Sequence, residues 1–158
     1  MNPLSPLLKN MINKKVNSII LNDKELYLLL DIDQKGNKVE ICFSNDEKLT
    51  IEPDYYSHFY GESDLEISLV NYKKTDSTGS INIALSNIYC WFFTPKGINI
   101  FPEKYIIHID FILESHNISV GFIEKSTETD LVINTSTIYV TNYFSLKERE
   151  NIKRFELK

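Results

Sequence analysis

Residues that cross-link, interrupt or ligate are scarce in this chain. Its 158 residues include two cysteines, five glycines, five prolines and three histidines. Cys42 and Cys90 lie in apolar runs without a metal-ligand spacing, so we expect two reduced, buried thiols rather than a disulfide or a zinc site. The glycines are isolated and form neither a phosphate-binding loop nor a dinucleotide-binding fingerprint. The low content of glycine and proline also argues against a disordered chain.

Targeting and membrane segments are also missing from the sequence. No run approaches the roughly 18 consecutive apolar residues that a membrane-spanning helix needs. The first residues lack the basic stretch followed by an apolar stretch that marks a secretory signal. We therefore expect a cytoplasmic protein that makes no contact with a membrane.

Alternation with a period of two dominates the rest of the chain and predicts a mainly β protein. Strand-like segments cover residues 15–43, 48–52, 65–72, 80–93, 104–124 and 131–144. Turns within the first segment are expected at residues 22–24 and 34–37. Because no helices separate the strands, we expect an antiparallel sandwich or a strongly curved sheet of about eight to nine strands.

Residues 104–124 are expected to form a central β-hairpin. Ile107, Ile109 and Phe111 share one face, and residues 114–117 interrupt the alternation as a turn. The opposite face is too apolar for a fully wetted surface, so we expect part of it to be covered.

In the preceding strand segment, the alternation slips by one residue near Ser86 and Asn87. A slip of this kind moves every later side chain to the other face of the sheet, which predicts a β-bulge at this point.

Both ends of the chain are predicted to be helical. Ser5 and Pro6 occupy the capping and first positions of a short amphipathic helix, and Ser145 with Glu148 forms a capping-box pattern. We therefore expect a single domain over residues 1–158. Its parts would be an N-terminal helix in residues 1–14, a β core in residues 15–144 and a C-terminal helix in residues 145–158.

The motifs for catalysis and metal binding are incomplete. Residues 31–37 begin like a calcium-binding loop, but Lys35 and Cys42 occupy positions that require oxygen ligands. His108 and Asp110 project from one face of a strand, which would let the carboxylate orient the imidazole, yet no nucleophile accompanies them. We expect no metal, no cofactor and no enzymatic activity, with an active site built on His108 as the alternative.

Negative charge is concentrated between residues 31 and 66. This segment holds ten acidic and three basic residues, although the net charge of the whole chain is only −5. It also contains an aromatic run, residues 55–60, that is unusual for a solvated loop. Carboxylates beside rigid aromatic side chains favour a binding face for a basic protein, which we expect to comprise Asp54, Tyr55, Tyr56, Tyr60, Glu62 and Asp64.

The same charge disfavours direct binding to nucleic acid, because such binding depends on neutralising phosphates. An open alternative is that the acidic residues are dispersed for solubility and that the aromatic rings cover the core.

In overall character the chain resembles the immunity proteins of bacterial toxin systems, including contact-dependent inhibition pairs. These are small, acidic, cytosolic proteins without catalytic motifs. The resemblance spans the whole chain and rests on no shared motif. It implies a non-enzymatic inhibitor that occludes the basic active site of a cognate toxin, with a nuclease as the expected toxin.

The alternative function is a small-molecule or carbohydrate-binding β domain. In that case Tyr89, Trp91 and Phe93 would line a cleft between two sheets, although rings in so apolar a stretch equally fit the core.

Overall fold

The structure is a computed structural model, and it describes residues 4–26, 32–54, 65–72, 81–93, 105–122, 124–126, 131–133, 137–142, 146–150 and 152–158. Within these residues it contains one helix, α1 (Leu4–Lys9), and thirteen strands. All of the strand pairings are antiparallel, so the chain is mainly β, as the alternation predicts. No helix in the described part is long and apolar enough to cross a membrane.

Eleven of the strands belong to one sheet. Its main path runs in the spatial order β3 (Asp33–Gly36), β12 (Ile138–Thr141), β9 (Asn117–Gly121), β8 (Tyr105–Leu113), β7 (Ile83–Phe93), β1 (Lys15–Leu21), β4 (Val39–Phe43), β5 (Glu47–Pro53) and β6 (Leu65–Asn71). In addition, β13 (Ile152–Glu156) pairs with β7 and β2 (Lys24–Glu25) pairs with β1. A separate two-stranded sheet joins β10 (Glu124–Ser126) to β11 (Leu131–Ile133). The number of strands exceeds the expected eight or nine because several strands have only two to four residues.

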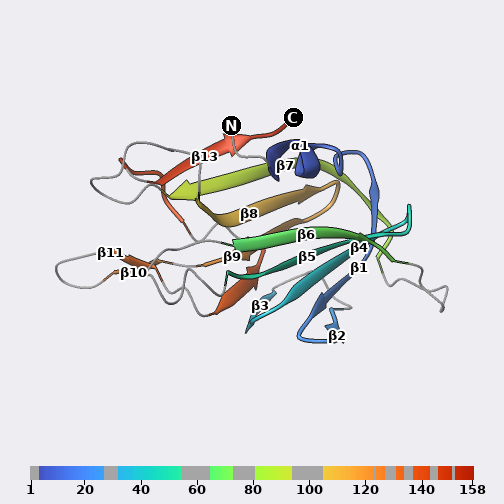
Figure 1. Cartoon of the computed structure of the whole chain (residues 1–158), viewed down its shortest axis with the longest axis horizontal. Helices are drawn as coiled ribbons and strands as arrows, with labels where there is room; N and C mark the ends of the chain where they lie inside the picture. The colour runs from blue at the N-terminus through green and yellow to red at the C-terminus, as the bar shows by residue number, and fades with distance from the viewer. Residues whose placement is uncertain are drawn as a thin grey trace.

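The large sheet divides into two layers at β7. One edge of β7 pairs with β8, and the opposite edge is shared by two strands. β1 pairs with Ile83 and Ala84 at the beginning of β7, whereas β13 pairs with residues 89–93 at its end. The sheet curves so strongly that β6 of one layer lies against β8 of the other (Figure 1).

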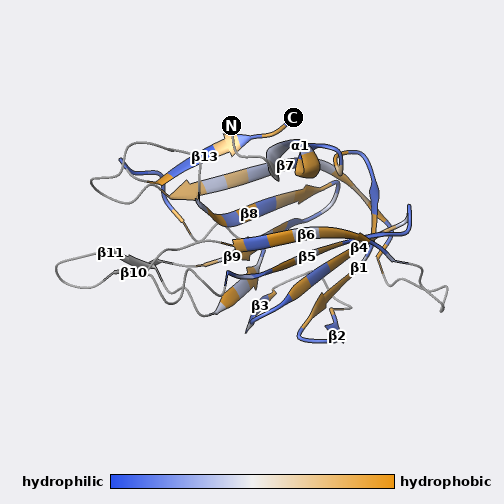
Figure 2. Cartoon of the chain, in the orientation of Figure 1, coloured by the Kyte–Doolittle hydropathy of each residue, from blue (hydrophilic) through white to orange (hydrophobic). Residues whose placement is uncertain are grey.

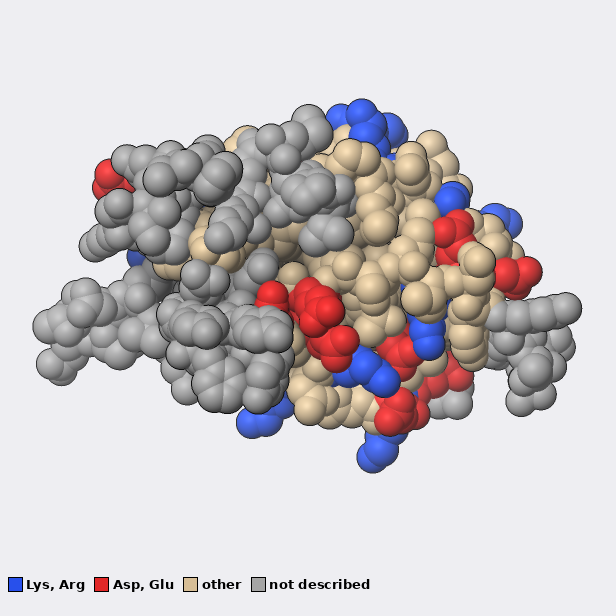
Figure 3. Space-filling model, viewed as in Figure 1, with Lys and Arg blue, Asp and Glu red and all other residues tan. Residues whose placement is uncertain are grey.

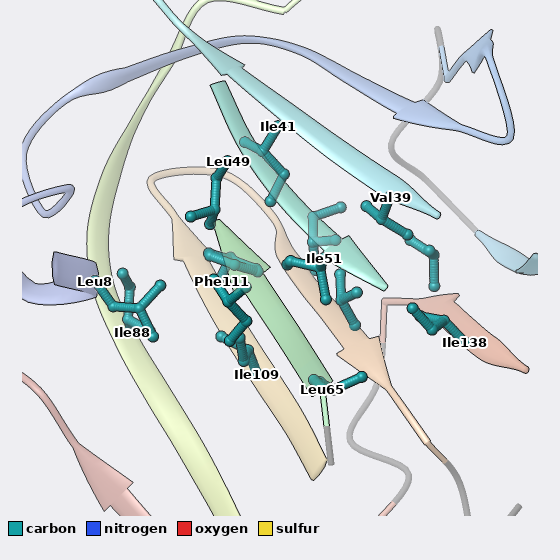
Figure 4. Close-up of a cluster of buried hydrophobic side chains, with 14 of the residues drawn as sticks. Leu8, Val39, Ile41, Leu49, Ile51, Leu65, Ile88, Ile109, Phe111 and Ile138 are labelled. Atoms are coloured by element: carbon teal, nitrogen blue, oxygen red, sulfur yellow. The ribbon is translucent and has the colours of Figure 1, made fainter. Parts of the chain in front are cut away.

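The core lies between these two layers. Leu49, Ile51 and Leu65 project from one layer toward Ile109 and Phe111 of the other (Figure 4). Each of these five side chains is at most 2% exposed. Hydrophobic and hydrophilic residues alternate along β6 and β8 (Figure 2), which places the polar residues of β6 on the opposite face. Alternation in the sequence therefore decides which face of each strand is buried.

The predicted central hairpin is confirmed. β8 and β9 pair with each other and lie between β7 and β12, and residues 114–116 form the turn. The second face of β8 is also covered, because Ile106, His108 and Asp110 are all buried.

The predicted bulge in β7 is confirmed as well. The register between β7 and β8 shifts between Leu85 and Asn87. The hydroxyl of Ser86 donates a hydrogen bond to the carbonyl oxygen of Ile112 at 2.8 Å, and the Asn87 side chain accepts one from the backbone N–H of Ile88 at 2.8 Å. These bonds satisfy polar groups at the point where the regular ladder is interrupted.

The N-terminal helix is present but shorter than predicted. It ends at Lys9, and the following N–H groups of Met11 and Ile12 bond to carbonyls only three residues earlier. Asn13 then has a φ of 77°. This tightened turn leads the chain directly into β1.

Of the two turns predicted in the first segment, one is confirmed and one is wrong. Asn22 and Asp23 both have positive φ and join β1 to β2, as a two-residue hairpin requires. Residues 34–37 were predicted to be a turn, but most of them belong to β3. That strand is stabilised by pairing with β12, about a hundred residues later in the chain, which a local pattern does not reveal.

The predicted C-terminal helix is wrong. Residues 152–156 form β13 instead, with Ile152 opposite Phe93 and Arg154 opposite Trp91. The side chain of Glu148, expected to complete a capping box, accepts a hydrogen bond from the backbone N–H of Arg154 at 2.9 Å. The available edge of β7 thus overrides a local helix signal, while Ser145 lies outside the described residues.

Candidate functional site

The predicted binding face follows the end of β5 directly. Asp54 is the first residue after that strand and is half-buried. Tyr55, Tyr56, Tyr60, Glu62 and Asp64 lie outside the described residues, so their part of the binding face stays a prediction. The predicted residues lie in the sequence between the end of β5 at Pro53 and the beginning of β6 at Leu65.

Two further carboxylates lie at the same end of these strands. Glu52 of β5 is directly opposite Glu66 of β6 in the strand register. Both point to the outer face, since the neighbouring Ile51 and Ile67 are buried in the core. Like charges directly opposite each other on antiparallel strands are destabilising. We call Glu52, Asp54 and Glu66 together the acidic end.

Two other acidic residues of the charged segment, Glu40 and Glu47, pair with lysines. Glu40 on the outer face of β4 lies 2.6 Å from the ammonium group of Lys48 and 3.7 Å from that of Lys38. The hydrogen bond from Glu40 raises the pKa of Lys48. Glu47 lies 3.1 Å from Lys14. Acidic and basic side chains accordingly lie side by side on the face seen in Figure 3.

Asp33 lies on β3, at the opposite end of the strand order from β6. Within the acidic end, the strand register places two of the carboxylates, Glu52 and Glu66, directly opposite each other.

A second group of polar residues is buried on the outer face of β7, β8 and β9. The carboxylate of Asp110, which is 0% exposed, accepts three hydrogen bonds. They come from the indole N–H of Trp91 at 2.7 Å, the hydroxyl of Ser119 at 2.8 Å and the guanidinium Nε of Arg154 at 3.1 Å. A buried carboxylate held by several donors in this way is a well-satisfied structural group.

Arg154 supplies the positive charge of this group from the last strand. Its guanidinium carbon lies 3.7 Å from the centre of the Tyr89 ring and 5.8 Å from that of Trp91. The stacking and the ion pair both hold β13 against β7. The sequence gives no signal for this contact, because Arg154 and Asp110 are 44 residues apart.

His108 is buried beside Asp110 but is not arranged for proton transfer to solvent. It is 1% exposed, and its Nδ1 lies 3.0 Å from the carbonyl oxygen of Phe122. Its Nε2 has no hydrogen-bond partner in the described part and is 3.5 Å from the nearer oxygen of Asp110. Burial lowers the pKa of His108, outweighing the opposite effects of Asp110 and of the Phe122 carbonyl. The imidazole is therefore held in its neutral form.

The remaining histidines do not complete a site with His108. His116 lies in the turn between β8 and β9, where its Nδ1 is 2.7 Å from the hydroxyl of Ser115. His58 lies outside the described residues. The two cysteines are free and buried, as predicted, and burial raises the pKa of Cys90 to about 12. A thiol with so high a pKa is a poor nucleophile.

Tyr89 and Trp91 of β7 do not line a cleft between the layers, and Phe93 is partly buried and packs against the hydrophobic core. Ile88 and Cys90 point into the core, so Tyr89 and Trp91 project from the opposite face of the strand. The ligand cleft suggested by the sequence is therefore absent at these two residues.

Neither a metal nor a small-molecule site stands out in the described part. It holds no group of three or more His, Cys, Asp or Glu residues close enough to share a metal ion. An open depression is lined by charged and amide side chains of both signs, namely Asn22, Asp23, Asn37, Lys38 and Glu52.

No family model matches the chain, and the searches of curated proteins and of solved structures return no match either. What the chain does has to be inferred from its own residues.

Proposed function

We propose that this chain is a non-enzymatic binding protein that docks a cation-rich protein at the acidic end and at the adjoining residues 55–64. The observation that supports the proposal is the pairing of Glu52 with Glu66 across β5 and β6. Two carboxylates in this register repel each other, and a cation placed between them removes that repulsion. A basic partner therefore gains binding energy by relieving this repulsion.

The aromatic side chains predicted in the same segment would add contact area. Tyr55, Tyr56 and Tyr60 lie in the sequence between Asp54 and Glu66. Tyrosine is among the residues that contribute most to the binding energy of protein interfaces. Charge would then govern the rate of encounter, while the rings would govern the lifetime of the complex.

The kind of partner that fits best is an enzyme with a basic cleft, such as a nuclease. A negatively charged surface that covers such a cleft competes with the nucleic acid for the same cationic groups. The proposed function is therefore that of an immunity-type inhibitor, which neutralises a cognate toxin by occluding its active site.

The test uses the purified chain and the product of the reading frame immediately upstream of its gene, with a panel of cation-rich toxin nuclease domains beside it. Binding is measured by titration calorimetry and inhibition by nucleic-acid cleavage, each at low and high salt. Glu52→Gln and Glu66→Gln are each expected to weaken binding by roughly threefold to tenfold at low salt, and less at high salt.

The matched control is Asp33→Asn, which removes one negative charge from the same sequence segment but from β3, which neither carries the acidic end nor pairs with β5 or β6. It should leave binding nearly unchanged. Equal losses for Asp33→Asn and Glu66→Gln would show that only net charge matters and would reject the acidic end as the docking site.

A further inference from the structure

β6 is the last strand in the order of the large sheet and lies beside β8 of the other layer on its core-facing side. Only β5 therefore pairs with it among the described residues. Its seven residues include a single charged residue, Glu66, and no proline. The other edge strands β3 and β13 are shorter and carry charged residues along their length, namely Asp33 and Lys35 on β3 and Lys153, Arg154 and Glu156 on β13. Charges of this kind protect an edge against pairing with another chain, and β6 largely lacks them.

The backbone groups that face outward from β6 can be identified. The N–H of Tyr72, one residue after β6, bonds to the carbonyl of Asp46, one residue before β5, so a hydrogen-bonded pair directly precedes the β5–β6 ladder. Such pairs alternate with pairs that do not exchange hydrogen bonds. The alternation puts Pro53 and its partner Leu65 in a non-bonded pair. This agrees with proline, which has no N–H to donate. The outward groups therefore belong to alternate residues of the strand, namely Leu65, Ile67, Leu69 and Asn71.

We infer that two copies of this chain associate through their β6 edges. Antiparallel pairing about a twofold axis at Ser68 places Ile67 opposite Leu69 of the second copy and Leu65 opposite Asn71 of the second copy. Every outward N–H and C=O of the strand then finds a partner. The two sheets become one continuous sheet through an isologous contact.

The side chains are complementary in the same register. On the outer face, Glu66 lies opposite Val70 of the second copy, and Lys48 of that copy is the next residue across the sheet. On the inner face, Ile67 meets Leu69 of the second copy and extends the apolar layer. The contact also covers Val70, which is 46% exposed in one copy.

Other symmetric registers are less favourable. An axis at Glu66 places the two Glu66 carboxylates opposite each other, and an axis at Ile67 or at Leu69 leaves one end of the strand unpaired. Only the axis at Ser68 uses the full length of β6 without a like-charge pair.

The first experiment measures self-association of the purified full chain, without any partner, by analytical ultracentrifugation over a range of concentrations. We expect a reversible dimer. Amide hydrogen exchange should show protection of the Ile67 and Leu69 N–H groups that is lost on dilution, while the Ser68 and Val70 N–H groups, which bond to β5, stay protected throughout.

Two pairs of variants test the register. Leu69→Pro removes an outward N–H and should weaken the dimer roughly tenfold or more, because two hydrogen bonds are lost per dimer. Leu69→Ala is its control, since it removes the same side-chain contacts and keeps the N–H.

Val70→Glu should weaken the dimer roughly fivefold by facing Glu66 of the second copy, and adding Glu66→Lys should restore it. Val70→Glu also faces Lys48 within its own chain, so the monomer remains folded.

Three results would overturn the inference. These are a monomer at every soluble concentration, a dimer in which Ile67 and Leu69 exchange as fast as in the monomer, and equal effects of Leu69→Pro and Leu69→Ala. Because no partner protein is present, each result is independent of the proposed function.

Discussion

Arg154, in the last strand, donates a hydrogen bond from Nε to the buried carboxylate of Asp110 at a distance of 3.1 Å. Asp110 lies near the middle of β8, and β7 lies between β8 and β13. The ion pair therefore spans three strands and joins the end of the chain to the central hairpin.

Removing the charge of Arg154 should destabilise the fold. The variant Arg154→Met leaves Asp110 buried with two neutral donors, and we expect a loss of about 2 kcal/mol in the free energy of unfolding. This figure is below the range for fully buried pairs because the Arg154 side chain is 25% exposed. Urea denaturation measures it, with Lys153→Met as an exposed control on the same strand that should change stability by less than about 0.5 kcal/mol. Equal effects of the two variants would contradict the role of the pair.

The buried neutral imidazole of His108 should make stability depend on pH. Burial lowers its pKa in the folded chain, so below about pH 6.5 the unfolded chain binds a proton that the folded chain does not. Stability should therefore be constant for this group above about pH 6.5 and should fall below it, by at most about 1.4 kcal/mol per pH unit. Urea denaturation between pH 5 and pH 8 would record the slope.

In the His108→Asn variant, the free energy of unfolding should no longer show this pH dependence, whatever its value at neutral pH. His116→Asn is the matched control, because His116 lies in the turn of the same hairpin and not beside Asp110. A slope that persists in His108→Asn, or disappears in His116→Asn, would show that another group is responsible.

Features determined by neighbouring residues were predictable from the sequence. The central hairpin follows from alternation, and the bulge at Ser86 and Asn87 follows from a slip of phase. Each depends on residues that are adjacent in the chain, so a local pattern contains the information.

Features determined by distant residues were not predictable. The last residues carry a helix-capping pattern, but pairing with β7 makes them a strand. β3 depends in the same way on β12. The partners of Asp110 come from three other strands, and nothing near Asp110 in the sequence indicates Arg154. The opposition of Glu52 and Glu66 likewise depends on the strand register, and neither residue was among the predicted binding residues.

The carboxylate pair of the acidic end should cost stability in the free protein. Replacing Glu66 by Gln removes the repulsion from Glu52, and we expect the free energy of unfolding to rise by about 0.5 kcal/mol at low salt and by less at high salt. Thermal unfolding at two salt concentrations measures the gain, with Glu114→Gln in an exposed turn as a control that should show none. The variant would thus gain stability while losing affinity for a basic partner. A loss of stability in Glu66→Gln would mean that the carboxylate has a structural role.

Gly121 should tolerate no side chain, because the β8–β9 pairing brings it against β8. Its φ is 151°, and a Cβ at this position would lie 2.5 Å from the carbonyl oxygen of Ile107 and 2.6 Å from the Cα of His108. Neither backbone atom can move without displacing the centre of the sheet, so Gly121→Ala should cost about 3 kcal/mol or more.

Gly36 provides the matched comparison. A Cβ there would approach the end of the Asn22 side chain and a terminal methyl of Leu21, each at 2.8 Å. Both are side-chain ends rather than backbone, but Asn22 Oδ1 accepts hydrogen bonds from the N–H groups of Asn37 and Lys38, and moving it would weaken them. Gly36→Ala should therefore cost about 1–2 kcal/mol, less than Gly121→Ala. Thermal unfolding of the two variants beside the unmodified chain compares them directly. Similar losses at both positions would show that crowding by backbone is not what restricts Gly121.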